Sequence, residues 1–451
     1  MPFPSGWVMP DGDISSSCFC LMNFGALNVN VPLSEGITSG SSSFLHDMAA
    51  AIAATVKISG VSLRKFIFFP AVLYDNLANI GIFVRKTATF VQILCLKDVM
   101  SKFFKTIFCA LSLFLCVSCA TDDRYVTITG YAQGGTYTVK LNLRGTDGPV
   151  KASPEEIRDS VDSILSRIDF SLSGYNKNSL LSRFNDGEAI VPDDIFLDIY
   201  THAWRIYDLT DGEVDVASAP LFDMWGFGFR NGELPDDDKV MGTLAECGLG
   251  RLRRDMETDP SGLVSPGSLL LTDGALPQLN YNAIAQGYSC DLVARYLYSV
   301  GVKDMMVDIG EIFCDGLNPS GQPWTLGIDR PVDGNNEPGA QMQGIFRAPE
   351  GPHGIVTSGN YRKYYVVDGR KYAHTIDPRT GYPVQHSLLS ATVVAPDALI
   401  ADAYATYCMV IGLEASKDFL SSHPELEGCL IYDDEGVFRT WCSEGFVLEE
   451  L

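Results

Sequence analysis

The amino-acid sequence predicts a mixed fold in which helices and strands alternate along most of the chain. Alternating apolar and polar residues between Tyr125 and Leu143 predict a β-hairpin. Ser153-Pro-Glu-Glu156 has the composition of a helix start, with a serine N-cap, a proline in the first turn and two acidic residues. The part of the chain after residue 119 is about 330 residues long, which allows two subdomains around one binding crevice.

The later elements follow from the spacing of apolar residues. The acidic stretch 230–275, which also contains glycine and proline, is predicted to be an irregular excursion. Helices are predicted over residues 157–168, 196–209 and 292–300, and strands over 305–309, 325–329 and 388–394.

Charge is distributed unevenly along the sequence. The whole chain has 33 basic and 56 acidic residues, of which residues 1–99 contain six of each, and Lys102 and Lys105 follow. The remainder therefore has 25 basic and 50 acidic residues, a net charge of −25. So acidic a domain is repelled by nucleic acid and by anionic lipid surfaces, which excludes both as binding partners.

A targeting segment is predicted at residues 100–119. Met100-Ser-Lys-Phe-Phe-Lys105 is a short basic region, and the apolar run from Ile107 to Val117 has the length of a signal peptide rather than of a membrane span. Ser118-Cys119 then resembles a bacterial lipoprotein signal, in which Cys119 becomes the lipidated N-terminus. Cys116 departs from the usual leucine of that motif, and a buried helix is the alternative interpretation.

Residues 1–99 show no coherent hydrophobic period and precede a complete signal sequence. We therefore expect Met100 to be the true start and residues 1–99 to be a non-native extension. Residues 120–451 are the expected catalytic domain, held by lipid at the periplasmic side of a bacterial membrane. Of the 12 cysteines, six lie at or before Cys119; the other six show no zinc-binding spacing and are expected to be buried small side chains, with one disulfide possible.

The segment His374-Thr-Ile-Asp-Pro-Arg-Thr-Gly381 has the composition of a ligand-binding loop. Pro378 and Gly381 favour a tight turn, and Asp377 can hold that turn through its backbone. His374 adds a group whose ordinary pKa suits proton transfer near neutrality. It is either a general base, or it orients the Asp377 turn or contacts phosphate.

A second segment, Ala401-Asp-Ala-Tyr-Ala-Thr406, is typical of the start of a helix. Asp402 and Thr406 are four residues apart, so their oxygens project from one helical face. A carboxylate and a hydroxyl in that position suit a hard cation bound to phosphate. The alternative for the two segments together is a hairpin turn followed by a capped core helix.

Further segments strengthen the functional interpretation. In chain order they are Ser171-Leu-Ser-Gly-Tyr175, Asp211-Gly-Glu-Val-Asp-Val-Ala-Ser-Ala-Pro-Leu221, Leu279-Asn-Tyr-Asn-Ala-Ile-Ala-Gln-Gly-Tyr-Ser-Cys-Asp291 and Val356-Thr-Ser-Gly-Asn-Tyr361. Together with the two segments above, they resemble the FAD:protein FMN transferase (ApbE) family, from about Gly134 to about Gly412.

This resemblance implies an α+β fold with a larger and a smaller part around a central FAD-binding crevice. It also implies that FAD is a substrate: its FMN half is transferred to a Ser or Thr hydroxyl of an acceptor protein, and AMP is released. The metal would be Mg²⁺, held by the side chains of Asp402 and Thr406 and by the backbone carbonyls of Ala283 and Ala405.

The FAD contacts implied by the resemblance are Gly134, Tyr175, Glu213, Val214, Asp215, Asn280, Gln286 and Ile376. Tyr175 can stack on a flavin or adenine ring or be a core residue, and Asp215 can bind the adenosine or be a turn aspartate. Asn280 stands where the family usually has aspartate, and Gln286 where lysine or glutamate is commoner. Gly310 stands alone where relatives have a pair of glycines.

Two other functions use the same residues. A magnesium-dependent FAD pyrophosphatase would give FMN and AMP, with water in place of the acceptor hydroxyl. A non-catalytic flavin-binding lipoprotein would bind FAD without converting it. A dehydrogenase is disfavoured, since no GxGxxG follows a predicted strand.

Overall fold

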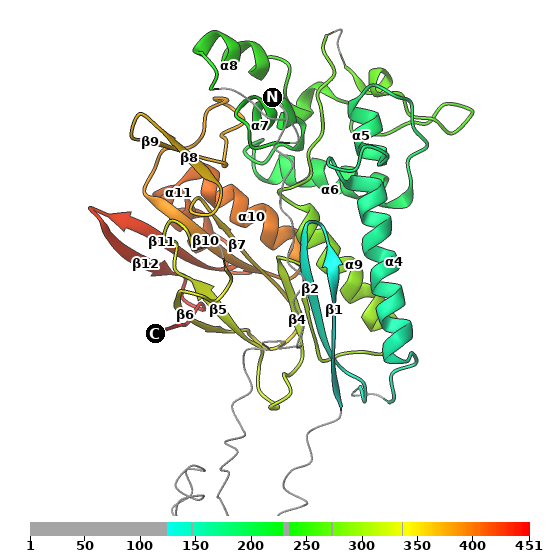
Figure 1. Ribbon diagram of the computed structural model, residues 1–451, viewed down its shortest axis with the longest axis vertical. Coiled ribbons are helices and arrows are strands. Elements are labelled where there is room, and N and C mark those ends of the chain that lie inside the picture. Colours follow the sequence, from blue (N-terminus) through cyan, green and yellow to red (C-terminus); the bar gives the residue numbers. More distant parts are fainter. Residues whose placement is uncertain (1–123, 146–147, 229–233, 272–273, 336) are drawn as a thin grey trace, which may run out of the picture. The chain divides into compact units, whose positions relative to one another are not determined.

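An antiparallel sheet of eight strands forms the centre of the fold in the computed structural model (Figure 1), with strand order β1-β2-β3-β4-β7-β10-β11-β12. The structure describes residues 124–145, 148–228, 234–271, 274–335 and 337–451. The strands are β1 (Tyr125–Ala132), β2 (Gly135–Asn142), β3 (Met305–Asp308), β4 (Ile312–Asp315), β7 (His353–Gly359), β10 (Leu388–Ala395), β11 (Glu427–Asp434) and β12 (Val437–Cys442).

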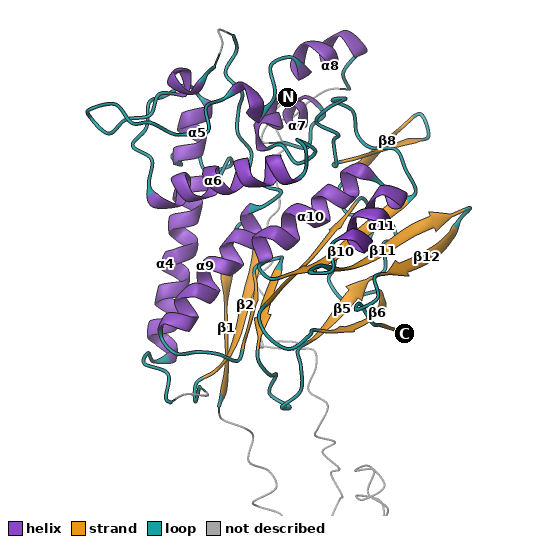
Figure 2. Cartoon of the chain, turned by 180° about the vertical axis from the view of Figure 1, so that it is seen from behind, coloured by secondary structure: helices purple, strands orange, loops and turns teal. Residues whose placement is uncertain are grey.

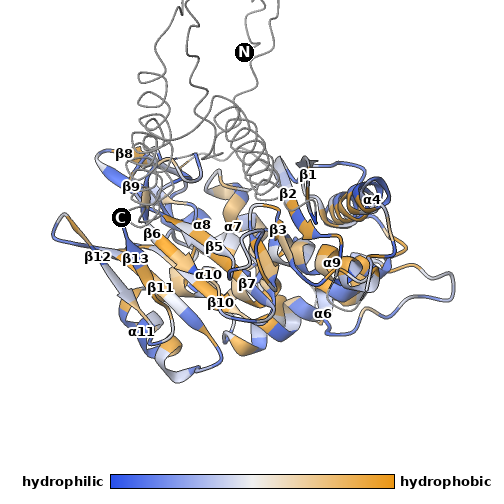
Figure 3. Ribbon diagram, turned by 90° about the horizontal axis from the view of Figure 1, so that it is seen from below, coloured by the Kyte–Doolittle hydropathy of each residue, from blue (hydrophilic) through white to orange (hydrophobic). Residues whose placement is uncertain are grey.

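Helices cover one face of this sheet, as Figure 2 shows for α9, α10 and α11. They are α4 (Pro154–Leu172), α9 (Ala285–Ser299), α10 (Ala398–Ile411) and α11 (Leu413–Ser422). The apolar sides of these helices and of the strands beneath them form the main core, which buries Val139, Val307 and Ala401 completely. Figure 3 shows apolar residues gathered where α9 and α10 meet the sheet.

Four further helices of the described residues lie in the segment between β2 and α9. They are α5 (Leu180–Asn185), α6 (Asp194–Leu209), α7 (Ala219–Met224) and α8 (Asp237–Leu244), with short 3-10 turns η2 (Val216–Ser218), η3 (Leu249–Arg251) and η4 (Pro266–Leu269). Residues of α5 and α6 belong to the main core, so the parts of the expected two-part fold share one core. The described residues, from 124 to 451 with their gaps, form one compact unit.

A second, smaller core joins the main sheet to a sheet of three strands in the order β13-β6-β5. Those strands are β5 (Thr325–Asp329), β6 (Met342–Arg347) and β13 (Leu448–Glu450). Phe346 and Phe446 stack with ring centroids 4.0 Å apart, and Ile355 and Cys429 reach the same core from the main sheet. A separate hairpin consists of β8 (Tyr364–Val367) and β9 (Arg370–Ala373).

Several predicted elements are confirmed. The hairpin is β1–β2, and α4 begins with a capping box in which the Ser153 hydroxyl accepts from the Glu156 amide at 3.2 Å and the Ser153 amide donates to the Glu156 carboxylate at 2.8 Å. The excursion at 230–275 is more ordered than expected, because it contains α8, η3 and η4. Helix α9 starts at Ala285, seven residues before the predicted start, since small residues allow the early turns to be buried.

Five of the six cysteines among the described residues are buried, and Cys442 is half-buried. In the described part of the chain, no helix has the length and apolar character that a membrane span requires. The predicted signal segment 100–119, with Cys119, and the predicted extension 1–99 lie outside the described residues.

Candidate active site

Helix α10 packs unusually close to β7 and α9, because glycines stand at both contacts. A Cβ atom on Gly354 of β7 would lie 2.3 Å from Cα of Ala398. A Cβ atom on Gly287 of α9 would lie 2.2 Å from the carbonyl oxygen of Ala398 and 2.9 Å from Cβ of Asp402. These distances exclude a side chain at either position. Gly354 lets α10 approach β7, and Gly287 lets Asp402 reach the first turn of α9.

The first turn of α10 is capped from two directions. Asp397 accepts a hydrogen bond from the amide of Ile400 at 2.8 Å. Asp291 of α9 accepts from the amides of Ala398 and Leu399, both at 2.9 Å. The helix therefore begins at Ala398, three residues earlier than the segment 401–406 suggested, and Asp402 lies in its second turn.

Asp402 is buried, with 5% of its surface exposed, and its Oδ2 accepts a hydrogen bond from the Gly287 amide at 3.0 Å. Burial, and then the charge of Asp291, raise its pKa to about 8. Thr406 follows one turn later, with its hydroxyl 3.5 Å from that of Ser358 at the end of β7. Ala405 is buried beside it, and Ala283 lies in the turn that leads into α9. The oxygens predicted to hold a metal thus lie on α10 and on the segment that enters α9.

Glu311 is a further member of this site that the sequence did not identify. It ends the three-residue turn between β3 and β4, which the sequence indicated only through Gly310. Burial, and then the negative charge of Asp402, raise the pKa of Glu311 well above its usual range, whereas a hydrogen bond with the Thr357 backbone lowers it. The two carboxyl groups are therefore close enough to repel each other electrostatically, which favours binding of a proton or a cation at this site.

The donor set suits a hard cation such as Mg²⁺. Carboxylate, hydroxyl and carbonyl oxygens are the ligands this ion takes, usually with one or two carboxylates and several waters. No group of three or more His, Cys, Asp or Glu with metal-binding geometry occurs in the described part of the chain. A metal at Asp402 would thus depend on few protein charges, which is compatible with substrate phosphates completing its shell.

Gln286, in the first turn of α9, lies very close to Gly310 in the turn between β3 and β4. The Gln286 amide donates to the carbonyl oxygen of Ile309 at 3.1 Å. Gly310 has φ +94°, and a Cβ atom there would lie 2.4 Å from Nε2 of Gln286. The approach of the Gln286 side chain to the turn therefore requires glycine at position 310.

The loop at 374–381 forms the predicted tight turn. The Asp377 carboxylate accepts from the Arg379 amide at 2.8 Å, and the Gly381 amide donates to the Asp377 carbonyl at 2.8 Å. Gly381 has φ +78°, which favours glycine. Its carbonyl oxygen accepts from the indole of Trp225 at 2.8 Å, and Ile376 is buried in the apolar cluster formed there with α7 and α8.

An ion pair joins this loop to the segment before α7. The Arg379 guanidinium lies 2.5 Å from Oε1 of Glu213, while Oε2 of Glu213 is buried without a hydrogen-bond partner. Burial raises the pKa of Glu213, although the charge of Arg379 opposes that shift. The predicted site residues Glu213 and Val214, both buried, are thereby held against the His374 loop.

Asp215 uses its carboxylate to organise the backbone. It accepts from the amide of Ala217 at 2.8 Å and from that of Leu249 at 3.1 Å, and burial raises its pKa to about 6. These bonds favour the structural interpretation of this residue over direct binding of adenosine. Asn280 lies next to this segment, since its amide donates to the carbonyl of Val216 at 2.7 Å, and its side-chain oxygen accepts from the Asn282 amide at 2.9 Å.

Tyr175 and Gly134 are the exposed members of the predicted set. Tyr175 lies in the loop after α4 with 64% of its surface exposed, so the core interpretation of this residue is wrong. Gly134 is at the turn of the β1–β2 hairpin with φ +81°, and no atom lies within 4 Å of the position a Cβ would take.

His374 has a defined tautomer. Its Nδ1 lies 3.2 Å from the carbonyl oxygen of Lys363, which only accepts, so Nδ1 has the proton and Nε2 has a lone pair. Burial, and then the charge of Lys363, lower the pKa of His374 to about 4. The imidazole is therefore neutral at pH 7, which favours the general base over a cationic contact with phosphate.

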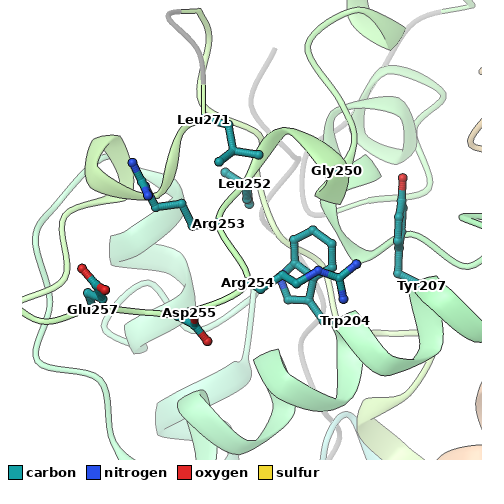
Figure 4. Close-up of a pocket in the computed structure, with 9 residues that line it drawn as sticks. All are labelled: Trp204, Tyr207, Gly250, Leu252, Arg253, Arg254, Asp255, Glu257 and Leu271. Carbon is teal, nitrogen blue, oxygen red and sulfur yellow. The ribbon is translucent and has the colours of Figure 1, made fainter.

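A cavity of about 430 Å³ lies elsewhere, beside the C-terminal half of α6 (Figure 4). None of the predicted site residues lines it. The Arg254 guanidinium lies 4.4 Å above the Trp204 ring and is paired with both carboxylate oxygens of Asp208, at 2.5 and 2.7 Å. Arg254 is therefore already paired, and the cavity contains none of the residues expected to bind FAD or metal.

Comparison with known proteins agrees with this geometry. The profile of the ApbE family matches residues 133–430. The FAD:protein FMN transferase of Escherichia coli K12 is 34% identical over 337 residues, which cover 72% of this chain and 90% of that protein. The flavin transferase ApbE of Vibrio cholerae (30% identity, TM-score 0.59) and the apo flavinyl transferase ApbE of Pseudomonas stutzeri (30% identity, TM-score 0.60) each align with 71% of this chain and with 97% and 95% of their own. The chain belongs to the ApbE family.

Proposed function

We propose that this protein is a flavin transferase that moves the FMN half of FAD to a Ser or Thr hydroxyl of an acceptor protein and releases AMP. The names of its relatives support flavin transfer to protein. The structural observation on which the proposal rests most is the buried Asp402 carboxylate, held by the Gly287 amide at 3.0 Å and followed one turn later by Thr406.

Asp402, Thr406 and the backbone carbonyls of Ala283 and Ala405 would hold Mg²⁺. When bound, this ion neutralises the pyrophosphate of FAD and supports departure of AMP. The Asp402 and Glu311 carboxylates repel each other, and a divalent cation held there would offset that repulsion.

His374 is proposed to accept the proton of the acceptor hydroxyl at its Nε2. The hydroxyl oxygen forms a bond to the phosphorus of the FMN phosphate, the bond from that phosphorus to the oxygen of AMP breaks, and AMP leaves with the electron pair. The hydrogen bond from Nδ1 to the Lys363 carbonyl keeps the lone pair on Nε2 until that atom accepts the proton. The rate advantage from such proton transfer is typically about 10²–10⁴-fold.

The two ends of FAD would be bound by different segments. Tyr175 offers an exposed ring for stacking on flavin or adenine. The segment around Glu213, Val214 and Asn280 is proposed to bind the adenosine end, with the side-chain NH2 group of Asn280 as a donor. Gln286, in the first turn of α9, is proposed as a further contact with FAD.

The decisive test is incubation of the purified protein with FAD, Mg²⁺ and a Ser/Thr-containing candidate acceptor domain. Denaturing gels viewed by flavin fluorescence, together with mass spectrometry of the acceptor, detect covalent FMN. The transferase predicts acceptor-bound FMN and one AMP per transfer. Free FMN and AMP without labelled acceptor would indicate the pyrophosphatase, and intact FAD would indicate a binding protein.

We also propose that the enzyme works at the periplasmic side of the bacterial cell envelope, anchored by a lipid on Cys119. The support is the order of basic region, apolar run and cysteine in residues 100–119. Expression from Met100 with Cys119→Ser should move the protein from the membrane fraction to the soluble fraction. Retention of the variant after a salt wash would exclude this anchor.

A further inference from the structure

Cys429 of β11 and Cys442 of β12 lie directly opposite each other in the antiparallel ladder. The neighbouring pair is hydrogen-bonded, because the Ser443 amide donates to the Gly428 carbonyl at 2.9 Å. Bonded and non-bonded pairs alternate along such a ladder, so the two cysteines occupy a non-hydrogen-bonded pair. The Cα atoms of a non-hydrogen-bonded pair are about 4.5 Å apart. That distance lies within the range of about 4.4–6.8 Å between the Cα atoms of disulfide-linked cysteines.

The two thiols point into the same apolar layer. Cys429 is fully buried in the small core beneath β5 and β6, and Cys442 packs against that core while half-buried. A hydrogen bond between the two thiols is the leading cause of a raised pKa for Cys429 and a lowered pKa for Cys442. Cys442 is thus both the more accessible and the more readily ionised thiol.

We infer that Cys429 and Cys442 form a cross-strand disulfide that fastens the edge strand β12 to β11. The Cys442 thiolate attacks an external disulfide such as glutathione disulfide, forms a mixed disulfide and releases one thiol. The Cys429 thiol then attacks the Cys442 sulfur, loses its proton and releases the second thiol. In total, two protein thiols become one disulfide while one external disulfide becomes two thiols.

The partner of each cysteine is fixed by the sheet. Cys314 contributes to the same core, but it lies on β4, and the order β4-β7-β10-β11 separates it from Cys429 by three strand spacings, about 14 Å. The disulfide closes the 14 residues from 429 to 442 and precedes β13, the strand that completes the small sheet. Its expected effect is therefore on the stability of the C-terminal edge rather than on the Asp402 site.

Trypsin offers a direct test, because Arg439 lies between the two cysteines. Cleavage after Lys417 and Arg439 places Cys429 in the peptide 418–439 and Cys442 in the peptide 440–451. The full chain is treated with glutathione disulfide, alkylated under denaturing conditions and digested without reductant. The disulfide predicts these two peptides as one linked species, which dithiothreitol separates. Recovery of both peptides alkylated at their cysteines would overturn it.

Thermal unfolding tests the disulfide independently and includes a matched control variant. Dithiothreitol should lower the Tm of the oxidised wild-type protein by on the order of 5 °C, as expected for a loop of this length in a domain of this size. The Tm of Cys442→Ser should not respond to dithiothreitol, whereas Cys314→Ala should keep both the linked peptides and the Tm response. An equal response of wild type and Cys442→Ser would contradict the disulfide.

Discussion

The amide of Gly287 donates a hydrogen bond to the carboxylate of Asp402 at 3.0 Å, and this bond joins the first turn of α9 to the second turn of α10. The contact exists only because residue 287 has no side chain. It sets both the position of the proposed metal ligand and the distance between the two helices.

We therefore expect Gly287→Ala to be costly for both stability and activity. Its Cβ would lie 2.2 Å from the Ala398 carbonyl oxygen, so α10 must move away. Overpacking of this kind costs about 1–3 kcal/mol. Urea unfolding measures the loss, and flavin transfer should fall with it. Gly242→Ala, inside α8 at a position with no atom within 4 Å of the added Cβ, is the control expected to keep flavin transfer unchanged and to keep or raise the stability.

Asp402→Asn is expected to remove activity without loss of the fold. The amide oxygen can still accept from Gly287, and a neutral side chain suits a buried position where the charged form of Asp402 is already disfavoured. Flavin transfer should fall by at least about 100-fold, as is typical when a group that stabilises transition-state charge is lost. The Tm should stay equal or rise. Turnover close to wild type at saturating Mg²⁺ would exclude Asp402 as the metal ligand.

The lowered pKa of His374 predicts a specific dependence of stability on pH. A folded-state pKa of about 4, below the ordinary 6.5, gives a stabilising contribution that is present above pH 6.5 and lost as the pH falls toward 4. At pH 5 the loss is about 1–2 kcal/mol relative to pH 7.

His374→Gln is the matched variant, since its amide can still donate to the Lys363 carbonyl. Urea unfolding at pH 7 and at pH 5 gives, for each protein, the free energy of unfolding that is lost between the two pH values. Wild type should lose more stability than the variant. Parallel loss in the two proteins would mean that the His374 imidazole is not held neutral by the fold.

The ion pair between Arg379 and Glu213 connects the His374 loop to the segment before α7. Arg379→Met would leave the buried Glu213 carboxylate without its cation, at a cost of about 1–2 kcal/mol because Arg379 itself is largely exposed. Adding Glu213→Gln should restore most of that loss. A double-mutant cycle in urea unfolding tests this, and additive losses would show that the two side chains do not interact energetically.

Local patterns were sufficient to predict several elements but not the contacts between them. The capping box at Ser153 and the turn at Asp377–Gly381 depend on residues close in sequence, and both were predicted correctly. Glu311 was missed because its significance comes from β3 and β4, which bring it to Asp402 across more than 90 positions of sequence. The backbone-capping role of Asp215 depends likewise on Leu249, which lies in an excursion that appeared irregular.

The last prediction separates binding of FAD from catalysis within the same site. Tyr175 is 64% exposed, so Tyr175→Ala should change the free energy of unfolding by no more than about 0.5 kcal/mol. If its ring stacks on FAD equally in the ground and transition states, the variant raises KM and leaves kcat unchanged.

Thr406→Val keeps the shape of the side chain but removes the hydroxyl near Ser358. This variant should mainly lower kcat, because a displaced metal no longer stabilises the charge that develops on the transferred phosphate. Steady-state kinetics of flavin transfer with FAD varied, at saturating acceptor and Mg²⁺, measure both signatures. A Tyr175→Ala enzyme with normal KM and a lowered kcat would show that the ring acts in the chemical step and not in stacking.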